Sequence, residues 1–147
     1  MNDKERETAK AYGAMVRRRF RELDKKNFAI LDELFDPAYV LHFAGMPTPM
    51  KLATTRQFYE MLYTAFPDLK HTIEEQVCAG NKVVTRWTAQ GTHHGDWMGI
   101  AATRKPISLT GINIYTVRRG KLSQSHVNWA RSPRGPPRRS GRMASVG

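Results

Sequence analysis

The sequence predicts an α+β fold, with helices in the first half of the chain and a mostly antiparallel sheet in the second. Up to about residue 65, apolar residues recur every three or four positions, which is typical of amphipathic helices. After Leu69 the period changes to two, which is typical of strands. The turns Gly80-Asn81 and Arg119-Gly120 separate the later runs, and hairpins of this kind join antiparallel strands. Helices followed by hairpins indicate the α+β class.

Three helices are expected. The first covers about residues 5–25, where Asn2 or Asp3 can cap its first turn. Its apolar stripe comprises Ala9, Tyr12, Val16, Phe20 and Leu23. A short second helix, residues 28–35, is expected to stop at Asp36-Pro37. The third is expected to open at the capping box Thr54-x-x-Gln57 and to end at Pro67. Its predicted buried residues are Phe58, Met61, Leu62 and Ala65.

The strands are predicted from alternation and from the turns that flank them. A short strand, residues 39–43, precedes a loop broken by glycine and proline at residues 44–51. In the next strand, one face is expected to carry Leu69, His71, Ile73, Glu75 and Val77. The remaining strands are expected at residues 82–91, 107–117 and 121–129.

Length and composition indicate one globular domain, residues 1–130, followed by a basic, disordered tail, residues 131–147. The chain has 147 residues, of which 40% are hydrophobic. Cys78 is the single cysteine, and no export signal or long apolar run is visible, so a cytoplasmic location without membrane attachment is expected. The net charge of +11 includes five tail arginines. We therefore expect nucleic-acid binding only weakly, through this tail.

Several short motifs follow one another in a suggestive order. They are Phe66-Pro67-Asp68, Gly91-Thr92-His93 with Gly95 and Gly99, Gly111-Ile112-Asn113, and Gly120-Lys121-Leu122 before Trp129. In this order and spacing, from about Ala9 to Trp129, the chain resembles the SnoaL-like polyketide cyclase (ester cyclase) family. The resemblance implies a cone-shaped α+β barrel, in which a curved sheet wraps the N-terminal helices around an apolar pocket. It also implies frequent homodimers and, in the characterised cyclases, metal-free ring closure of a polyketide ester.

The end of the last predicted strand departs from the family pattern. Members usually carry a Trp-Asp pair there, and the acid serves as general acid/base. This chain reads Trp129-Ala130, and an alanine methyl group cannot exchange a proton.

His126 and Asn128 alternate with Ala130 on one face of the last strand, which the resemblance implies is the pocket face. His126 is a candidate base because its unperturbed pKa lies near neutrality, and Asn128 is a candidate oxyanion donor. The alternative is that the two side chains bind each other or water at the edge of the sheet.

His93 matches the Gly-Thr-His position of the family and is the second catalytic candidate. The alternative is a structural histidine that bonds to the turn at Gly95. His94 must point to the opposite face of a strand, and Asp96 fits a turn or rim position. His42 lines the mouth of the cavity or is merely half-buried.

Trp97, Trp129 and Asn113 are the other predicted substrate-binding residues. The tryptophans would wall an aromatic pocket, although such residues are more often plain core. Asn113 could fix a ligand carbonyl; alternatively, Ile112 and Ile114 point inward and Asn113 points out.

No metal site is predicted, because the histidines lack a ligand spacing and Cys78 has no partner cysteine. No phosphate-binding loop is visible, so no cofactor is expected. We expect a cofactor-free acid/base enzyme, an aldol-type cyclase or isomerase, with a small apolar or aromatic carbonyl ligand. The alternative is a non-catalytic binding protein on the same scaffold that has lost the catalytic Asp.

Overall fold

The computed structural model describes residues 1–132. Its first element is helix α1, Asp3–Asp24. Asn2 caps this helix, since its side chain accepts from the Glu5 backbone N–H while the Glu5 carboxylate accepts from the Asn2 backbone. The predicted first helix and its cap are therefore confirmed. The predicted tail lies outside the described residues, apart from Arg131 and Ser132.

A short helix and a long strand follow α1. Helix α2 is Ile30–Leu34, and strand β1 runs directly on as Phe35–Phe43. The prediction that residue 35 belongs to the helix is wrong, because Phe35 already pairs with Leu122 in extended conformation.

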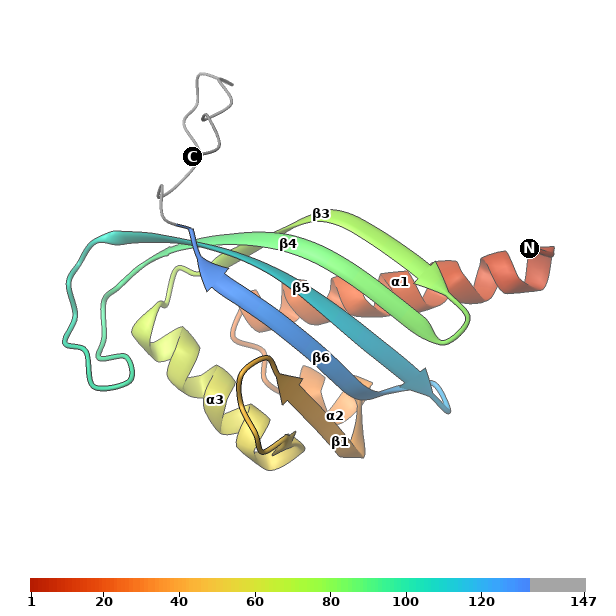
Figure 1. Cartoon of the computed structure of the whole chain (residues 1–147), viewed down its shortest axis with the longest axis horizontal. Coiled ribbons are helices and arrows are strands. Elements are labelled where there is room, and N and C mark those ends of the chain that lie inside the picture. The colour runs from red at the N-terminus through yellow and green to blue at the C-terminus, as the bar shows by residue number, and fades with distance from the viewer. Residues whose placement is uncertain (133–147) are drawn as a thin grey trace, which may run out of the picture.

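Six strands form one sheet in the order β2-β1-β6-β5-β4-β3. Beyond β1, they are β2 (Met50–Lys51), β3 (Lys70–Ala79), β4 (Lys82–Thr92), β5 (Pro106–Arg118) and β6 (Lys121–Arg131). Successive hairpins make β3 to β6 antiparallel, whereas β1 lies parallel to β6. The four long strands arch together in Figure 1, so the predicted curved and mostly antiparallel sheet is confirmed.

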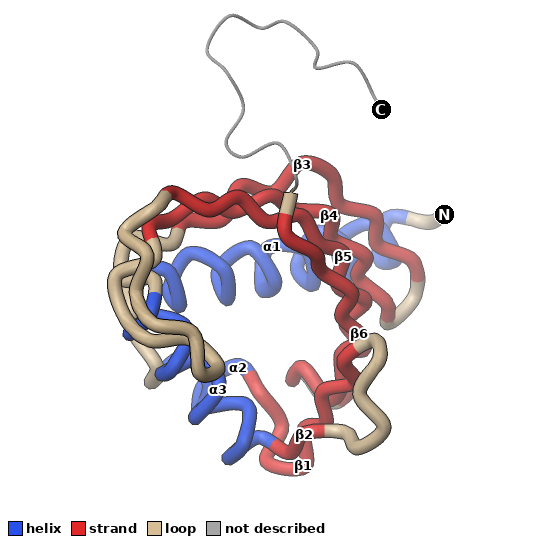
Figure 2. Tube along the Cα trace, turned by 60° about the vertical axis from the view of Figure 1, so that its left-hand side comes forward, coloured by secondary structure: helices blue, strands red, loops and turns tan. Residues whose placement is uncertain are grey.

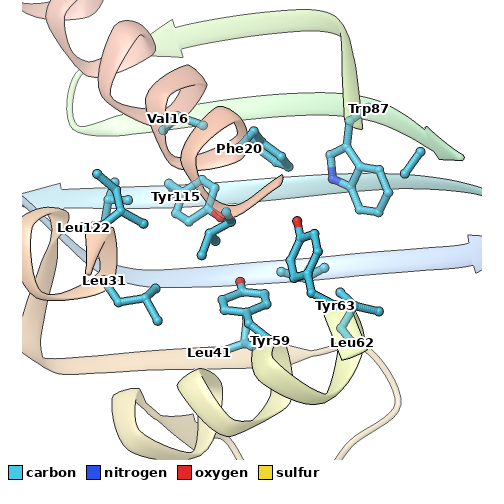
Figure 3. Close-up of a cluster of buried hydrophobic side chains, with 14 of the residues drawn as sticks. Val16, Phe20, Leu31, Leu41, Tyr59, Leu62, Tyr63, Trp87, Tyr115 and Leu122 are labelled. Atoms are coloured by element: carbon cyan, nitrogen blue, oxygen red, sulfur yellow. The ribbon is translucent and has the colours of Figure 1, made fainter. Parts of the chain in front are cut away.

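The helices lie on the concave side of this sheet. Figure 2 shows α1 beneath β3 and β4, with α2 and α3 opposite them and the strands curving round between. Side chains from both layers meet in one core. In Figure 3, Val16 and Phe20 of α1 face Tyr59 and Tyr63 of α3 across the interior.

Two details of the predicted helices and strands are wrong. Helix α3, Leu52–Ala65, begins two residues before Thr54, so the expected capping box is not formed. Met61, which was expected to be buried on this helix, is exposed. In β3 a bulge between Ile73 and Glu75 shifts the alternation. Because of it, Val77 faces outward and Gln76 faces α1 instead, where its side-chain amide donates to the Gly13 carbonyl.

Within residues 1–132, no helix is long and apolar enough to cross a membrane.

Gly111 in β5 leaves room for the largest side chain of the adjacent strand. It pairs with Trp87 of β4, whose indole lies across the position where a side chain would project. A Cβ atom added at Gly111 would come within 2.2 Å of the indole carbon Cζ2. The glycine of the Gly-Ile-Asn motif is therefore required by packing.

We expect Gly111→Ala to reduce the free energy of unfolding by about 1–3 kcal/mol, because the indole must move within a packed core. Urea denaturation measures this change. Thr110→Ala, on the exposed face of the same strand, is the matched control. Equal stability of the two variants would contradict the packing role of Gly111.

Candidate functional site

An internal cavity of about 40 Å³ lies between α1, α3 and the concave face of the sheet. Most of its wall is apolar or aromatic. The polar side chains that line it are Arg19, Tyr59, Tyr63, His71 and Asn113. A few polar groups in an apolar pocket are typical of a small-molecule site.

Asp24 and His71 form a part-buried pair beside this cavity, and the imidazole of His71 lines it. Asp24 is the last residue of α1 and His71 is the second residue of β3, so the pair joins two elements that are distant in sequence. The imidazole Nδ1 lies 2.8 Å from Asp24 Oδ1, and the His71 backbone N–H donates to Oδ2 at 2.7 Å. Tyr63 of α3 also donates its hydroxyl to Oδ1, at 2.6 Å. These three hydrogen bonds fix the carboxylate, and the carboxylate fixes the ring.

The environment keeps the imidazole neutral and the carboxyl ionised near pH 7. Burial lowers the pKa of His71, and it outweighs the opposing effect of Asp24; the positive charge of Arg19 lowers it further. Burial by itself would raise the pKa of Asp24, but the hydrogen bonds from His71 and Tyr63 hold it below the ordinary value. Since Nδ1 donates to the carboxylate, Nε2 carries the lone pair. This arrangement is that of an oriented general base.

Arg19 is a buried cation without an acidic partner. Its exposed fraction is 5%, and within residues 1–132 no carboxylate lies in ion-pair range of it. One terminal nitrogen donates to the Tyr59 hydroxyl at 2.5 Å, while Nε is buried without a partner. The guanidinium carbon also lies 4.2 Å from the centre of the Phe20 ring. A desolvated ring contact of this kind contributes about 2 kcal/mol or more, whereas removing an ion from water costs on the order of several kcal/mol.

Asn113 faces the interior, while Ile112 and Ile114 are exposed. Of the two alternatives left open by the sequence, the inward one is therefore correct. Its Oδ1 accepts from Trp87 Nε1 at 2.8 Å, and its Nδ2 donates to the Tyr115 hydroxyl at 3.1 Å. These bonds hold the indole and the amide in place along the cavity wall.

A second, larger chamber of about 430 Å³ lies beside the inner cavity. Leu109 and Trp129 line both spaces. The loop between β4 and β5 contributes Trp97, whose ring centre lies 5.7 Å from that of Phe66. We call this space the outer chamber. Trp97 and Trp129 therefore line a pocket as well as packing against the core, although no ligand contact is shown.

His93 lies at the wall of the outer chamber and is buried. Its Nδ1 accepts from the Thr103 backbone N–H at 3.4 Å and lies 3.1 Å from Thr103 Oγ1. A neutral ring that accepts at Nδ1 carries its proton on Nε2, and this donor is buried without a partner. His93 thus bonds to Thr103 and not to the turn at Gly95.

The prediction that His126 and Asn128 line the pocket is wrong. Both are exposed on the convex face of β6, because the residues that point inward are Ser125, Val127 and Trp129. His42 of β1 is not at the cavity mouth either. Its ring stacks on that of His126, with centres 4.4 Å apart and planes 9° apart. Periodicity placed His126 and Asn128 on a common face, but it could not decide which face is concave.

Four residues of the inner site were missed as functional candidates: Arg19, Asp24, Tyr59 and His71. The sequence contains an indication for two of them, Arg19 and His71. Arg19 is three residues after Val16 and four before Leu23, so it lies on the apolar stripe of α1. His71 was assigned to the patterned face of its strand. Nothing in the sequence pairs Asp24 with His71, because 47 residues separate them.

Comparison with known proteins assigns the fold and the family. The family model described as SnoaL-like polyketide cyclase matches residues 14–129. This chain belongs to the SnoaL-like polyketide cyclase family. No curated protein matches it.

Several solved structures share this fold. AclR, a putative hydroxylase from Streptomyces galilaeus, is 18% identical with a TM-score of 0.76, and the match covers 86% of this chain and 92% of AclR. IdmH, a putative polyketide cyclase from Streptomyces antibioticus, is 25% identical with a TM-score of 0.73, covering 80% of this chain and 91% of IdmH. A putative polyketide cyclase from Acidithiobacillus ferrooxidans is 26% identical with a TM-score of 0.71, covering 81% and 87%.

Ala130, where resemblance to the family implies an acid, lies at the end of β6 and lines the outer chamber. It does not line the inner cavity; the carboxylate beside that cavity is that of Asp24, which binds the lining residue His71. In the described part of this SnoaL-like chain, no three His, Cys, Asp or Glu side chains are grouped as metal ligands would be.

We expect the stability of the protein to fall as the pH drops below about 6.5, the ordinary pKa of histidine. Since the folded pKa of His71 is depressed, the unfolded chain takes up a proton first, and acid favours unfolding. His71→Gln removes this contribution, so wild type should lose more stability than the variant between pH 7 and pH 5. Urea denaturation across this range measures it. If the free energies of unfolding of wild type and His71→Gln differed by the same amount at pH 7 and pH 5, this would contradict a neutral His71 imidazole in the folded protein.

Proposed function

We propose that the protein catalyses cofactor-free proton transfer at a carbon next to a carbonyl, as in an aldol-type cyclisation or an isomerisation. The observation that carries this proposal is the Asp24–His71 pair, whose imidazole lines an apolar cavity. Membership of a family of polyketide cyclases supports the reaction class. The base differs from the sequence-based candidates, because His126 lies on the outer face and Ala130 cannot carry a proton.

The first step is removal of a proton by His71. Nε2 takes it from the carbon next to the carbonyl, and the electron pair of the C–H bond moves to the carbonyl oxygen. The ring becomes an imidazolium, which Asp24 stabilises through Nδ1–H, as in other carboxylate–histidine pairs. The enolate then attacks a second carbonyl of the substrate or reprotonates at another carbon. His71 returns the proton and regains its neutral form.

Tyr59 is placed to stabilise the negative oxygen. Its hydroxyl oxygen accepts from Arg19, so its own proton is free to be donated to a substrate oxygen. The positive charge behind the hydroxyl increases its strength as a donor. A fixed donor in an apolar site is worth more than the same donor in water.

The sizes of the two cavities indicate where the two ends of a substrate would lie. The inner cavity of about 40 Å³ has room for only a few atoms, which would include the reacting end. The outer chamber of about 430 Å³ is of the size that receives a drug-sized molecule. An apolar or aromatic substrate body would lie there against Trp97 and Trp129.

We expect His71→Gln and Asp24→Asn each to slow the exchange of α-protons of a bicyclic ketone such as 2-tetralone by roughly 10²–10⁴-fold, the usual contribution of a general base. Proton NMR in D₂O measures this exchange without knowledge of the natural substrate. His126→Ala is the matched control, because it removes an exposed histidine from the outer face, and its rate should equal that of wild type.

Two results would contradict the proposed function. Exchange that survives His71→Gln would exclude His71 as the base. Binding of the ketone by wild type with no exchange above the buffer rate would favour the non-catalytic binding protein.

A further inference from the structure

The inner cavity contains a positive charge that has no acidic partner among residues 1–132. Arg19 is buried, and within these residues its Nε has no hydrogen-bond partner. Two acids follow Arg19 on its own helix: Glu22 forms no ion pair with it, and Asp24 is already bound by His71 and Tyr63. Buried guanidinium groups in proteins are ordinarily paired with an anion.

We propose that the substrate carries a carboxylate, which enters the inner cavity and pairs with Arg19. This inference rests on the proposed function for its location and extends it by naming a substrate class, an apolar or aromatic molecule with an acidic group. An enolate that forms only during turnover would leave Arg19 unpaired in the bound ground state. A permanent carboxylate compensates the charge as soon as the substrate binds.

The charges that line the outer chamber agree with an anionic ligand. Lys105 and Arg131 line the outer chamber, and no Asp or Glu does. The sequence contains no acidic residue after Asp96, so β5 and β6 carry positive charges alone. A concave site with charges of one sign attracts ligands of the opposite sign.

The size of the cavity limits where the carboxylate can be. Arg19 and His71 line the same space of about 40 Å³. A carboxylate held by Arg19 and a carbon within reach of His71 must therefore be separated by only a few bonds. The acidic group lies near the reacting carbon, and the apolar body extends toward Trp129 and the outer chamber.

The test compares an acid with its neutral counterpart of the same shape. We expect wild type to bind 2-naphthoate at least tenfold more tightly than 2-naphthamide by isothermal titration calorimetry. Arg19→Met, which keeps the length of the side chain without its charge, should lose this preference. Arg18→Met is the matched control, because Arg18 is the exposed neighbour that pairs with Glu33, and it should keep the preference.

A thermal-unfolding measurement adds a readout that does not depend on ligand. Free Arg19→Met should melt at the same temperature as wild type or higher, because an uncompensated buried charge has been removed. 2-Naphthoate should raise the melting temperature of wild type and leave that of Arg19→Met unchanged. A lower melting temperature of free Arg19→Met would show that the tyrosine and ring contacts suffice to stabilise the guanidinium, and would count against the proposal.

The outcomes separate this inference from the proposed function. His71→Gln should keep the preference for the acid while losing proton exchange. Equal binding of acid and amide by wild type would overturn the carboxylate proposal, even if proton exchange were intact. A preference that persists in Arg19→Met would also overturn it, because the anion would then be bound elsewhere.

Discussion

The packing of α1 against β3 is the constraint on which the interior of this protein depends. Gly13 permits close approach, since a Cβ atom there would come within 2.8 Å of Gln76 Oε1. Gln76 donates to the Gly13 carbonyl, and farther along the contact Asp24 accepts both the backbone and the ring N–H of His71. The same carboxylate therefore fixes the start of β3 and orients the imidazole. The bonds between Asp24 and His71 therefore serve both the packing of α1 on β3 and the proposed chemistry.

The curvature of the sheet determines which polar side chains are enclosed and which face solvent. On the convex face, His42 and His126 stack near solvent, where water can satisfy their nitrogen atoms. Between the concave face and the helices, Arg19, His71 and Asn113 lie among aromatic side chains, and each bonds to a partner from another element. A charge or a lone pair in that environment has a much larger electrostatic effect than it would have in water.

Aromatic residues make the interior rigid as well as apolar. Tyr59 and Tyr63 rise from α3 toward Trp87 and Tyr115 in Figure 3, and their hydroxyl groups bond to Arg19 and Asp24 respectively. Trp87 is held between Gly111 and the bond to Asn113. Catalytic groups held in this way keep their geometry without help from a ligand, which is the condition for efficient electrostatic stabilisation.

The class of fold, most of the helices and strands, and the resemblance to the family can all be predicted from the sequence, because they depend on periodicity, turns and short motifs. Of the predicted substrate-binding residues, Asn113 lines the inner cavity, and Trp97 and Trp129 line the outer chamber, as does the catalytic candidate His93. Their roles stay predictions. Which face of β6 is concave follows from the curvature of the assembled sheet. Alternation marks two faces but does not say which is enclosed, so His126 and Asn128 were placed on the wrong side. The pairing of Asp24 with His71 and the isolation of Arg19 likewise arise from contacts between distant segments, which no local pattern encodes.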